Sequence, residues 1–378
     1  MAKVVLSGYY GFDNLGDEAV LFSILKTLRD LRIGLRIEVL SNTPVETAEI
    51  YKVTSSNRWK LKDVYLALKD ADLFISGGGS LLQDVTGLKS LLYYLGVIWL
   101  ARKMGKPVFF YAQGIGPVNS RLGQFLMRRV VNRVDCITVR DESSREDLHN
   151  MKINRPCVRV TADPVLGLEQ KFVQNSTGRQ ILEEAGLDLS IERKLVGISL
   201  REWQGLAGFK EVMAEVCDKL SRIGYQVVFL PMHYPDDLET SREVAEKMQQ
   251  PAVVLSEHYS VVEMAGLIAS MDLLIGMRLH ALILAAVMHV PPVALSYDPK
   301  IDRFMGLLGK SAAIHVSEPN FEQLWCAVEE IICEPWLARE DLILAVEPLR
   351  QIAQSTAALA LDVMDRSRNK KGQAASYL

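Results

Sequence analysis

Two basic side chains stand between a strand pattern and a helix pattern in the second half of the chain. Arg278 and His280 follow the apolar run 273–276 and precede a longer apolar run, 281–288. This order predicts a turn at the carboxyl end of a parallel strand, where open α/β sheets bind ligands and the next helix offers free N–H groups to an anion. No acidic residue lies near Arg278 in the sequence, so we expect its partner to be a bound phosphate or carboxylate.

Other strand ends of the second half carry groups of the same kind. Arginine suits bidentate recognition of phosphate or carboxylate, so several basic turns together suit a small, multiply charged anion. A local structural role is the alternative for Arg201 and His233. The candidate residues of this half are Arg201, His233, Arg278, His280, Tyr297 and Lys300.

The first half has acidic and glycine-rich turns instead. A short strand pattern at 4–6 breaks into the loop 7–18, and a helical pattern runs over 19–31. The glycine spacing differs from the dinucleotide-binding G-x-G-x-x-G. Asp13, Asn14 and Asp17 either cap the helix or face a ligand.

A run of three glycines, 77–79, follows the strand pattern 72–76. Such a turn lets a ligand or another backbone come close. We favour a ligand over tight packing, because Gln83 and Asp84 follow within a helical turn. Arg140 either pairs with Asp141 or faces the ligand. The candidate residues of this half are Asp13, Asn14, Gly16, Asp17, Gly77, Gly78, Gly79, Ser80, Gln83, Asp84, Gln113, Gly114 and Arg140.

Composition limits the possible functions. The 378 residues include 43 basic and 46 acidic side chains, and the net charge of -3 argues against a general nucleic-acid surface. Five scattered cysteines indicate neither a disulfide framework nor a zinc site, and no carboxylate-rich metal pattern appears. These features predict a reduced, cytoplasmic compartment, no metal and no cofactor.

The sequence shows no membrane span or leader. The first apolar run is too short for a signal peptide, and the longest, 91–101, is about half the ~20 residues that a bilayer requires. The helical pattern 90–103 carries Tyr93, Tyr94 and Trp99 and ends in basic residues. It is expected to be a core helix, and contact with a membrane surface is the alternative.

Strand and helix patterns alternate in both halves, which predicts an α/β protein with two Rossmann-like, doubly wound domains facing a cleft. The run Asp72–Ser76 also resembles Asp272–Gly276 at an offset of 200, which predicts related halves. We expect an N-terminal domain at 1–170, which would bind a bulky, hydroxyl-rich acceptor, and a C-terminal domain at 194–335, which would bind a compact anionic donor. A linker is expected at 171–193, helices returning to the first domain at 336–365 and a polar tail at 366–378.

These motifs together resemble the polysaccharide pyruvyl transferase family over about residues 3–335. The residues that carry the resemblance are Gly8–Glu18, Gly77–Ser80, Gln113–Pro117, Arg140-Asp141, Arg278-Leu279-His280 and Tyr297–Lys300. The first and last of these motifs are specific to the family. Within it, the chain is similar in particular to the CsaB-type enzymes of S-layer bacteria, which pyruvylate the cell-wall polymer that anchors S-layer proteins.

The resemblance implies a fold like that of GT-B glycosyltransferases and phosphoenolpyruvate as the donor substrate. The implied product is a pyruvate ketal on a lipid-linked saccharide that contains N-acetylmannosamine. It also implies that Arg278, His280 and Arg201 bind the donor. The enzyme would be cytoplasmic, with a peripheral contact at the inner membrane surface as an option.

Ketal formation needs an acid and a base beside the reacting carbon, together with cations for carboxylate and phosphate. Asp13 is our candidate base towards a sugar hydroxyl, and His280 the candidate acid or phosphate ligand. The sequence leaves open which of the two moves a proton first, and it does not identify the acceptor sugar, its hydroxyls, the stereochemistry or the oligomeric state. A nucleotide-sugar glycosyltransferase and a non-catalytic envelope-assembly scaffold are the alternative functions.

Overall fold

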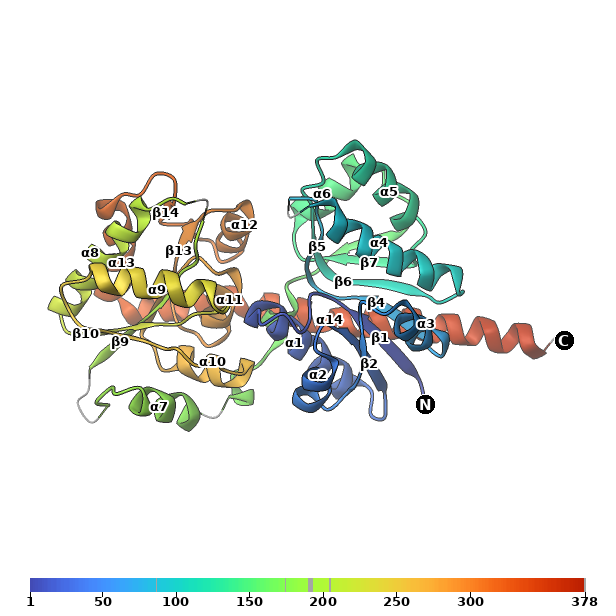
Figure 1. Cartoon of the computed structure of the whole chain (residues 1–378), viewed down its shortest axis with the longest axis horizontal. Coiled ribbons are helices and arrows are strands. Elements are labelled where there is room, and N and C mark those ends of the chain that lie inside the picture. The colour runs from blue at the N-terminus through green and yellow to red at the C-terminus, as the bar shows by residue number, and fades with distance from the viewer. Residues whose placement is uncertain (86, 174, 190–192, 204, 377–378) are drawn as a thin grey trace. The chain divides into compact units, whose positions relative to one another are not determined.

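The computed structural model describes residues 1–85, 87–173, 175–189, 193–203 and 205–376 (Figure 1). The chain forms two compact units. Unit 1 comprises residues 1–13, 17–167 and 349–378, and unit 2 comprises residues 14–16 and 168–348. The short segment 14–16 therefore belongs to unit 2 although both of its flanks belong to unit 1.

Unit 1 is built on a parallel sheet with strand order β3-β2-β1-β4-β6-β7-β8, and β5 pairs with β6. The central strands are apolar and buried on both faces, as expected of a parallel sheet covered by helices. The strands are β1 (Lys3–Ser7), β2 (Arg36–Ser41), β3 (Thr54–Asn57), β4 (Leu73–Ser76), β5 (Gly79–Leu82), β6 (Val108–Ile115), β7 (Cys136–Val139) and β8 (Cys157–Val160).

Helices cover both faces of this sheet. The helices are α1 (Leu15–Leu31), α2 (Pro44–Tyr51), α3 (Leu61–Lys69), α4 (Leu88–Lys103), α5 (Arg121–Val131) and α6 (Glu142–Asn150), with the short η1 (Pro164–Gly167). Helices α3 to α6 share one apolar core with the sheet, including Val64, Leu95, Met127 and Leu148. The segment 44–69 supplies α2, β3 and α3.

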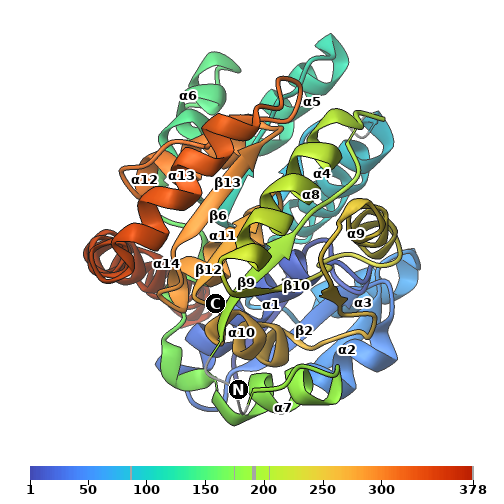
Figure 2. The same cartoon turned by 90° about the vertical axis from the view of Figure 1, so that its left-hand side faces the viewer.

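Unit 2 repeats the architecture with strand order β11-β10-β9-β12-β13-β14, again parallel. Its strands are β9 (Lys194–Ser199), β10 (Tyr225–Phe229), β11 (Ala252–Val254), β12 (Leu273–Gly276), β13 (Pro292–Ser296) and β14 (Ile314–His315). Its helices are η2 (Gln170–Phe172), α7 (Asn175–Glu184), α8 (Gly208–Arg222), α9 (Asp236–Lys247), α10 (Val261–Ala269), α11 (Leu279–Val287), α12 (Pro299–Leu307) and α13 (Phe321–Cys333). Figure 2 views this unit with helices on both sides of its strands.

The two sheets have equivalent centres, in which β4 and β12 are related by the offset of 200 residues. Asp72 accepts a hydrogen bond from the backbone N–H of Lys3 at 2.8 Å, and Asp272 accepts one from that of Leu195 at 2.8 Å. The backbone N–H groups just after β4 and β12 likewise donate to the last residues of β1 and β9. The glycine turn after β4 and the Arg278 turn after β12 thus occupy equivalent strand ends.

Helix α14 (Pro335–Ser376) begins in unit 2, and its residues from 349 onward belong to unit 1. There Arg32 forms a bidentate ion pair with Asp365, and Gln354 donates to the backbone carbonyl of Gly167 at 2.9 Å. The residues from 366, expected to be a polar tail, continue this helix to Ser376.

The expected linker, 171–193, includes α7, which packs on α10 where Gly178 faces Gly266. A small residue on each helix allows this close approach, which explains an ordered helix in a polar stretch. Residues 174 and 190–192 of that stretch and residues 377–378 of the expected tail lie outside the described residues.

Candidate functional site

Each sheet has a switch point, at which the connections from two adjacent strands run towards opposite edges of the sheet. It lies between β1 and β4 in unit 1 and between β9 and β12 in unit 2. Ligands of open α/β sheets bind at the carboxyl ends of the strands beside such a point. In unit 2, Arg201 follows β9 and Arg278 follows β12, so two of the predicted cations stand at this point.

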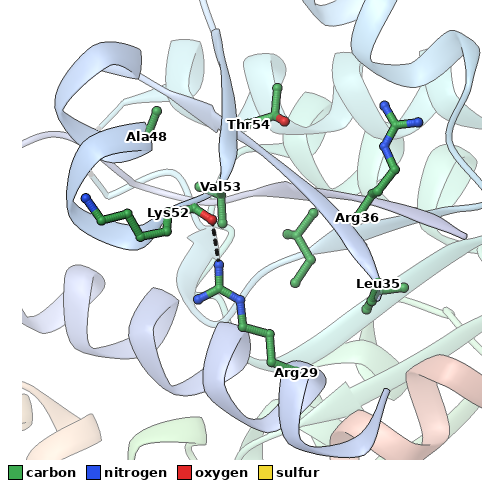
Figure 3. A pocket seen from close by; sticks show the side chains of 8 residues that line it. Arg29, Leu35, Arg36, Ala48, Lys52, Val53 and Thr54 are labelled. Carbon is green, nitrogen blue, oxygen red and sulfur yellow. Dashed lines mark hydrogen bonds between the residues drawn. The ribbon is translucent and has the colours of Figure 1, made fainter. Parts of the chain in front are cut away.

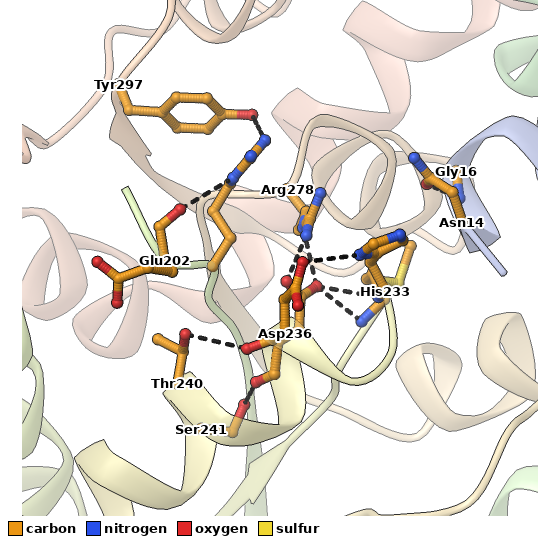
Figure 4. Close-up of polar contacts among 12 residues, drawn as sticks. Asn14, Gly16, Glu202, His233, Asp236, Thr240, Ser241, Arg278 and Tyr297 are labelled. Carbon is orange, nitrogen blue, oxygen red and sulfur yellow. Dashed lines mark hydrogen bonds and ion pairs between the residues drawn. The ribbon is translucent and has the colours of Figure 1, made fainter. Parts of the chain in front are cut away.

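Arg278 has a carboxylate partner within unit 2, which corrects the expectation that a ligand would be its only one. Its Nε donates to Asp237 at 2.8 Å, and its Nη2 donates to the second oxygen of the same carboxylate. Figure 4 shows the guanidinium pointing towards the start of α9, beside His233 and Asp236. A guanidinium has five N–H donors, so this pair uses two and orients the rest.

Asp237 is wholly buried and was missed by the sequence reasoning. Its Oδ2 also accepts the backbone N–H groups of Met232 and His233, at 3.1 and 3.0 Å. The carboxylate thus joins the end of β10 to the turn after β12. The available signal was an acidic pair at the predicted start of a helix, but helix capping explains such a pair equally well.

His233 contacts the segment of the β1–α1 loop that belongs to unit 2. Asn14 and His233 form an antiparallel bridge, and the backbone N–H of Leu15 donates to the carbonyl of Met232 at 3.0 Å. The imidazole Nδ1 lies 3.6 Å from the carboxylate of Asp236. The predicted residues Asn14 and His233 are therefore neighbours.

His280 lies in the first turn of α11, against Gly16. A Cβ atom added to Gly16 would come within 2.3 Å of the imidazole Nδ1, so only glycine fits beside this ring. Arg278 is the N-cap residue of the helix, and its side chain makes no capping hydrogen bond. The first-turn N–H groups are therefore suited to an anion.

Arg201 lies on aromatic rings at the neighbouring strand end. Its guanidinium donates to the hydroxyl of Tyr297 at 3.0 Å and lies 4.9 Å from the centre of that ring and 5.2 Å from that of Trp203. Within the described part of the chain, no carboxylate contacts Arg201. None of the described carboxylates therefore neutralises its positive charge, in contrast to that of Arg278.

Lys300 reaches the same tyrosine. Its ammonium lies 5.3 Å from the centre of the Tyr297 ring and 3.3 Å from the carboxylate of Asp298. Asp298 also caps α12 by accepting the N–H of Lys300 at 3.0 Å. Tyr297, which is buried, thus connects the two predicted cations Arg201 and Lys300.

In unit 1, the loop after β1 is held by a half-buried carboxylate. Glu18 accepts the backbone N–H of Gly11 at 2.8 Å and the hydroxyl of Tyr51 at 2.6 Å. Burial raises the pKa of Glu18 above its usual value, the two hydrogen bonds lower it and the nearby charge of Asp13 raises it further, so the pKa is raised overall. Gly11 has φ +75°, a conformation that glycine adopts readily.

Asp13 is exposed at the tip of this loop. Its φ of 55° lies in the left-handed region, which aspartate and asparagine tolerate better than most residues. Backbone of this kind recurs at functional sites. The carboxylate is therefore presented to solvent from the carboxyl end of β1.

The glycines after β4 have packing partners in the protein itself. A Cβ on Gly77 would meet the hydroxyl of the buried Tyr10 at 2.1 Å, and one on Gly78 would meet Val20 at 2.8 Å. Gly79 has φ +85° and lies near Asp17, at 3.0 Å from the added Cβ to the carboxylate. Tight packing, the alternative set aside above, explains Gly77 and Gly78, and a ligand role for them stays a prediction.

A polar network lies at the ends of β6 and β7. The amide of Gln113 donates to Ser76 and to the carbonyl of Gly77, at 2.7 and 2.8 Å, so this residue fastens the glycine turn. Arg140 donates to the hydroxyl of Ser80 at 3.0 Å and pairs with Asp163 at 3.3 Å. The network therefore brings the predicted residues Ser80, Gln113 and Arg140 together.

Three further predicted residues border this network. A Cβ on Gly114 would lie 2.8 Å from both Arg140 and Ser80. Asp84 accepts the backbone N–H groups of Asn119 and Ser120 at 2.8 and 2.7 Å. Burial opposes ionisation of Asp84, but these hydrogen bonds lower its pKa overall, which indicates a structural role for the carboxylate. Gln83 is half-buried between β5 and α4.

A cavity of about 400 Å³ in unit 1 lies away from these groups. Figure 3 shows Arg29, Arg36 and Lys52 around it, and Arg29 donates to the carbonyl of Lys52 at 2.9 Å. It adjoins the amino ends of β2 and β3, at the edge opposite to the one that carries the predicted site residues. It therefore takes no part in the candidate site.

A family model described as polysaccharide pyruvyl transferase matches residues 14–299, well over half of the chain. The chain belongs to the polysaccharide pyruvyl transferase family. This pyruvyl transferase is similar to the amylovoran biosynthesis protein AmsJ of Erwinia amylovora, with 22% identity over 368 residues that cover 81% of this chain and 86% of that protein.

Solved structures resemble the pyruvyl transferase in fold. UDP-GlcNAc 2-epimerase from Neisseria meningitidis aligns with a TM-score of 0.65 and 10% identity, covering 96% of this chain and 100% of the other. A glycosyltransferase from Rickettsia africae aligns with a TM-score of 0.60 and 12% identity, covering 98% and 97%. These likenesses confirm the predicted GT-B-like fold of two Rossmann-like domains.

No helix in the described part of the chain is both long and apolar enough to cross a bilayer. No group of three or more His, Cys, Asp or Glu side chains in it is placed to hold a metal ion.

Proposed function

We propose that this pyruvyl transferase moves the enolpyruvyl unit of phosphoenolpyruvate onto two hydroxyls of a lipid-linked saccharide containing N-acetylmannosamine. The product is a pyruvate ketal, and phosphate is released. The observation that carries the donor assignment is the position of Arg201 and Arg278 at the strand ends beside the switch point of unit 2. The reaction uses no cofactor.

In this proposal the donor anion contacts unit 2. Arg201, which no described carboxylate neutralises, binds the carboxylate or phosphate of phosphoenolpyruvate as a fork. Arg278, held in place by Asp237, presents its remaining N–H groups to the same anion. The first turn of α11, which the Arg278 side chain does not cap, adds backbone N–H donors to this anion.

Unit 1 offers acceptor-side groups. Asp13 takes a proton from a sugar hydroxyl, and the network around Ser80, Gln113 and Arg140 supplies hydrogen bonds to other hydroxyls. Donation of a proton to the CH2 carbon of the enol phosphate leaves a cationic carbon that the first hydroxyl attacks as its proton passes to Asp13. Loss of phosphate and closure by the second hydroxyl then complete the ketal, with His280 as the candidate proton donor.

The test is phosphate release by the purified protein. With phosphoenolpyruvate and an N-acetylmannosamine-containing disaccharide, we expect phosphate and a disaccharide heavier by one pyruvate ketal in the mass spectrum. Release of nucleotide from a nucleotide sugar, with phosphoenolpyruvate left intact, would replace this function by glycosyl transfer. Release of neither product in a full donor and acceptor panel would favour the assembly scaffold.

Replacing Arg201 by lysine is expected to raise the KM for phosphoenolpyruvate by about tenfold, because a point charge cannot form the bidentate fork. The KM for the saccharide should stay within about twofold, since Arg201 is assigned to the donor alone. Steady-state phosphate release measures both constants. Arg222→Lys, at an exposed position on α8, is the control, and an unchanged donor KM in Arg201→Lys would remove Arg201 from the donor site.

We place the reaction in secondary cell-wall polymer synthesis for S-layer anchoring, at the cytoplasmic face of the membrane. A lipid-linked acceptor requires access to that surface. Helices α4 and α5 pack side by side and expose Leu92, Trp99, Leu122 and Phe125, at 41, 48, 53 and 56%. Lys103 lies over Trp99 and Arg129 over Phe125, so apolar rings and cations alternate as they do on interfacial helices.

Trp99→Glu combined with Phe125→Glu is expected to reduce binding to vesicles containing anionic lipid by about tenfold or more, because two insertable rings are lost and negative charge is added. Cosedimentation with phosphatidylglycerol vesicles measures the bound fraction. Trp336→Glu, at a tryptophan that is 78% exposed in unit 2, is the matched control. Equal binding of the double variant and the control would exclude this face as the membrane contact.

A further inference from the structure

A buried arginine in unit 1 lies among aromatic rings at the start of the β1–α1 loop. Arg58 is 3% exposed, and its guanidinium carbon lies 4.4–5.3 Å from the ring centres of Phe12, Trp59, Tyr93 and Tyr94. It donates to the carbonyl of Gly8 at 2.6 Å and to the hydroxyl of Tyr94 at 3.1 Å. The ring faces stabilise a cation that, among the described residues, contacts no carboxylate.

We call Arg58 with these four rings the Arg58 cluster. It orders the β1–α1 loop, which carries Asp13 at its tip. Gly8 and Phe12 belong to that loop, and Phe12 stacks on Tyr9 with the ring centres 4.0 Å apart and the planes 6° from parallel. Asp13, the candidate general base, is therefore attached to a loop that is held by aromatic packing. None of these aromatic residues is used by the donor site or by the proton transfers described above.

The outer side of the cluster is exposed but firmly held. Trp59 is 60% exposed and Tyr9 37%. The indole N–H of Trp59 nevertheless donates to Asn42 at 2.8 Å, and the Asn42 amide donates to the carbonyl of Gly11 at 3.1 Å. A large exposed ring whose orientation is fixed by hydrogen bonds and by a cation beside it is preorganised for contact with a ligand.

We propose that the exposed indole of Trp59 forms a stacking platform for a sugar ring of the saccharide acceptor. The Tyr9–Phe12 stack stands beside it, with the ring centres of Phe12 and Trp59 6.4 Å apart and their planes at 89°. The apolar C–H face of a pyranose suits a flat indole, while its hydroxyls suit the exposed carboxylate of Asp13, which directly follows Phe12 in the chain. A lipid chain would offer no hydrogen-bond donor to the carboxylate of Asp13. This inference rests on the proposed function, because that function supplies the saccharide.

The platform would also determine how the sugar ring is oriented. A ring that stacks on Trp59 has its edge, and not its covered face, directed towards hydrogen-bonding groups. Two neighbouring hydroxyls at that edge can then reach one carboxylate in succession, as closure of a ketal requires. Arg58 acts as a positioning residue here, since it contacts the rings and the loop but not the sugar.

Trp59→Ala is expected to raise the dissociation constant for the saccharide acceptor by about tenfold, because the stacking face is lost. The KM for phosphoenolpyruvate should remain within about twofold, since the donor groups lie in unit 2. Trp59→Phe, which keeps an aromatic face, should recover most of the affinity. Trp336→Ala is the matched control for removal of an exposed tryptophan.

Saturation-transfer NMR with soluble methyl glycosides of N-acetylmannosamine, N-acetylglucosamine and galactose provides a readout without catalysis. If phosphoenolpyruvate is not the donor, sugar binding that is lost in Trp59→Ala and kept in Trp336→Ala still supports the platform. The platform is excluded if the wild type binds no glycoside of the panel and no acceptor disaccharide, or if Trp59→Ala binds them as the wild type does. Thermal melting of Trp59→Ala within about 2 °C of the wild type shows that the variant is folded.

Discussion

Replacing Asp237 by alanine is expected to lower the free energy of unfolding by about 3–5 kcal/mol, because it leaves the largely buried guanidinium of Arg278 without its carboxylate. The side chains of Arg278 and Asp237 are 14% and 0% exposed, so little solvent is available to replace the lost interaction. The backbone N–H groups of Met232 and His233 lose their acceptor as well. Urea unfolding followed by circular dichroism and by tryptophan fluorescence measures the change.

The neighbouring residue provides the control for this experiment. Asp236 has a 64% exposed side chain and lies 3.6 Å from His233, so Asp236→Ala should change stability by no more than about 0.5–1 kcal/mol. The double variant Asp237→Ala with Arg278→Met removes both charges and should recover part of the loss. An unfolding midpoint of Asp237→Ala equal to that of the wild type would show that the ion pair contributes no net stability.

Replacing Asp13 by asparagine is expected to reduce kcat by about 10²–10⁴-fold, the range that a positioned general base contributes. Asparagine also tolerates the left-handed backbone at this position, where φ is 55°, so the loop should keep its shape. The KM for phosphoenolpyruvate should not change, because Asp13 is assigned to the acceptor. Phosphate release under saturating donor measures kcat directly.

Asp30→Asn is a suitable control, since Asp30 lies on the exposed face of α1 and pairs only with Lys26 among the described residues. That variant should turn over as the wild type does. Turnover of Asp13→Asn at the wild-type rate would exclude Asp13 as the base and leave His280 as the remaining candidate for proton transfer. The two variants together thus separate a catalytic carboxylate from a change in surface charge.

The position of Arg278 illustrates how far sequence reasoning reached. The apolar run before it and the helix after it were local patterns, and they correctly predicted a strand end beside a helix start. Its partner Asp237 lies 41 residues away, in the first turn of another helix. Pairing over such a distance depends on which strands are adjacent, so the lack of a nearby acidic residue did not indicate a missing partner.

Gly77 and Tyr10 show the same limit in unit 1. A glycine after a buried strand indicates that another group approaches the backbone closely, but it does not identify that group. The structure places the Tyr10 hydroxyl there, on a residue that follows a different strand. Likewise, Arg58 carried no signal in the sequence, because its four rings come from three separate segments of the chain.

The sequence by itself determined the alternation of strands and helices, the relation between the halves at an offset of 200 residues and the motifs of the pyruvyl transferase family. These features depend on residue order over one or two elements, where periodicity and turn chemistry act. Only the tertiary structure decided that Asp237 holds Arg278, that Tyr10 fills the space beside Gly77 and that Arg58 lies among four aromatic rings. Each of these is a contact between side chains far apart in the chain, and its energy exists only once the sheets have assembled.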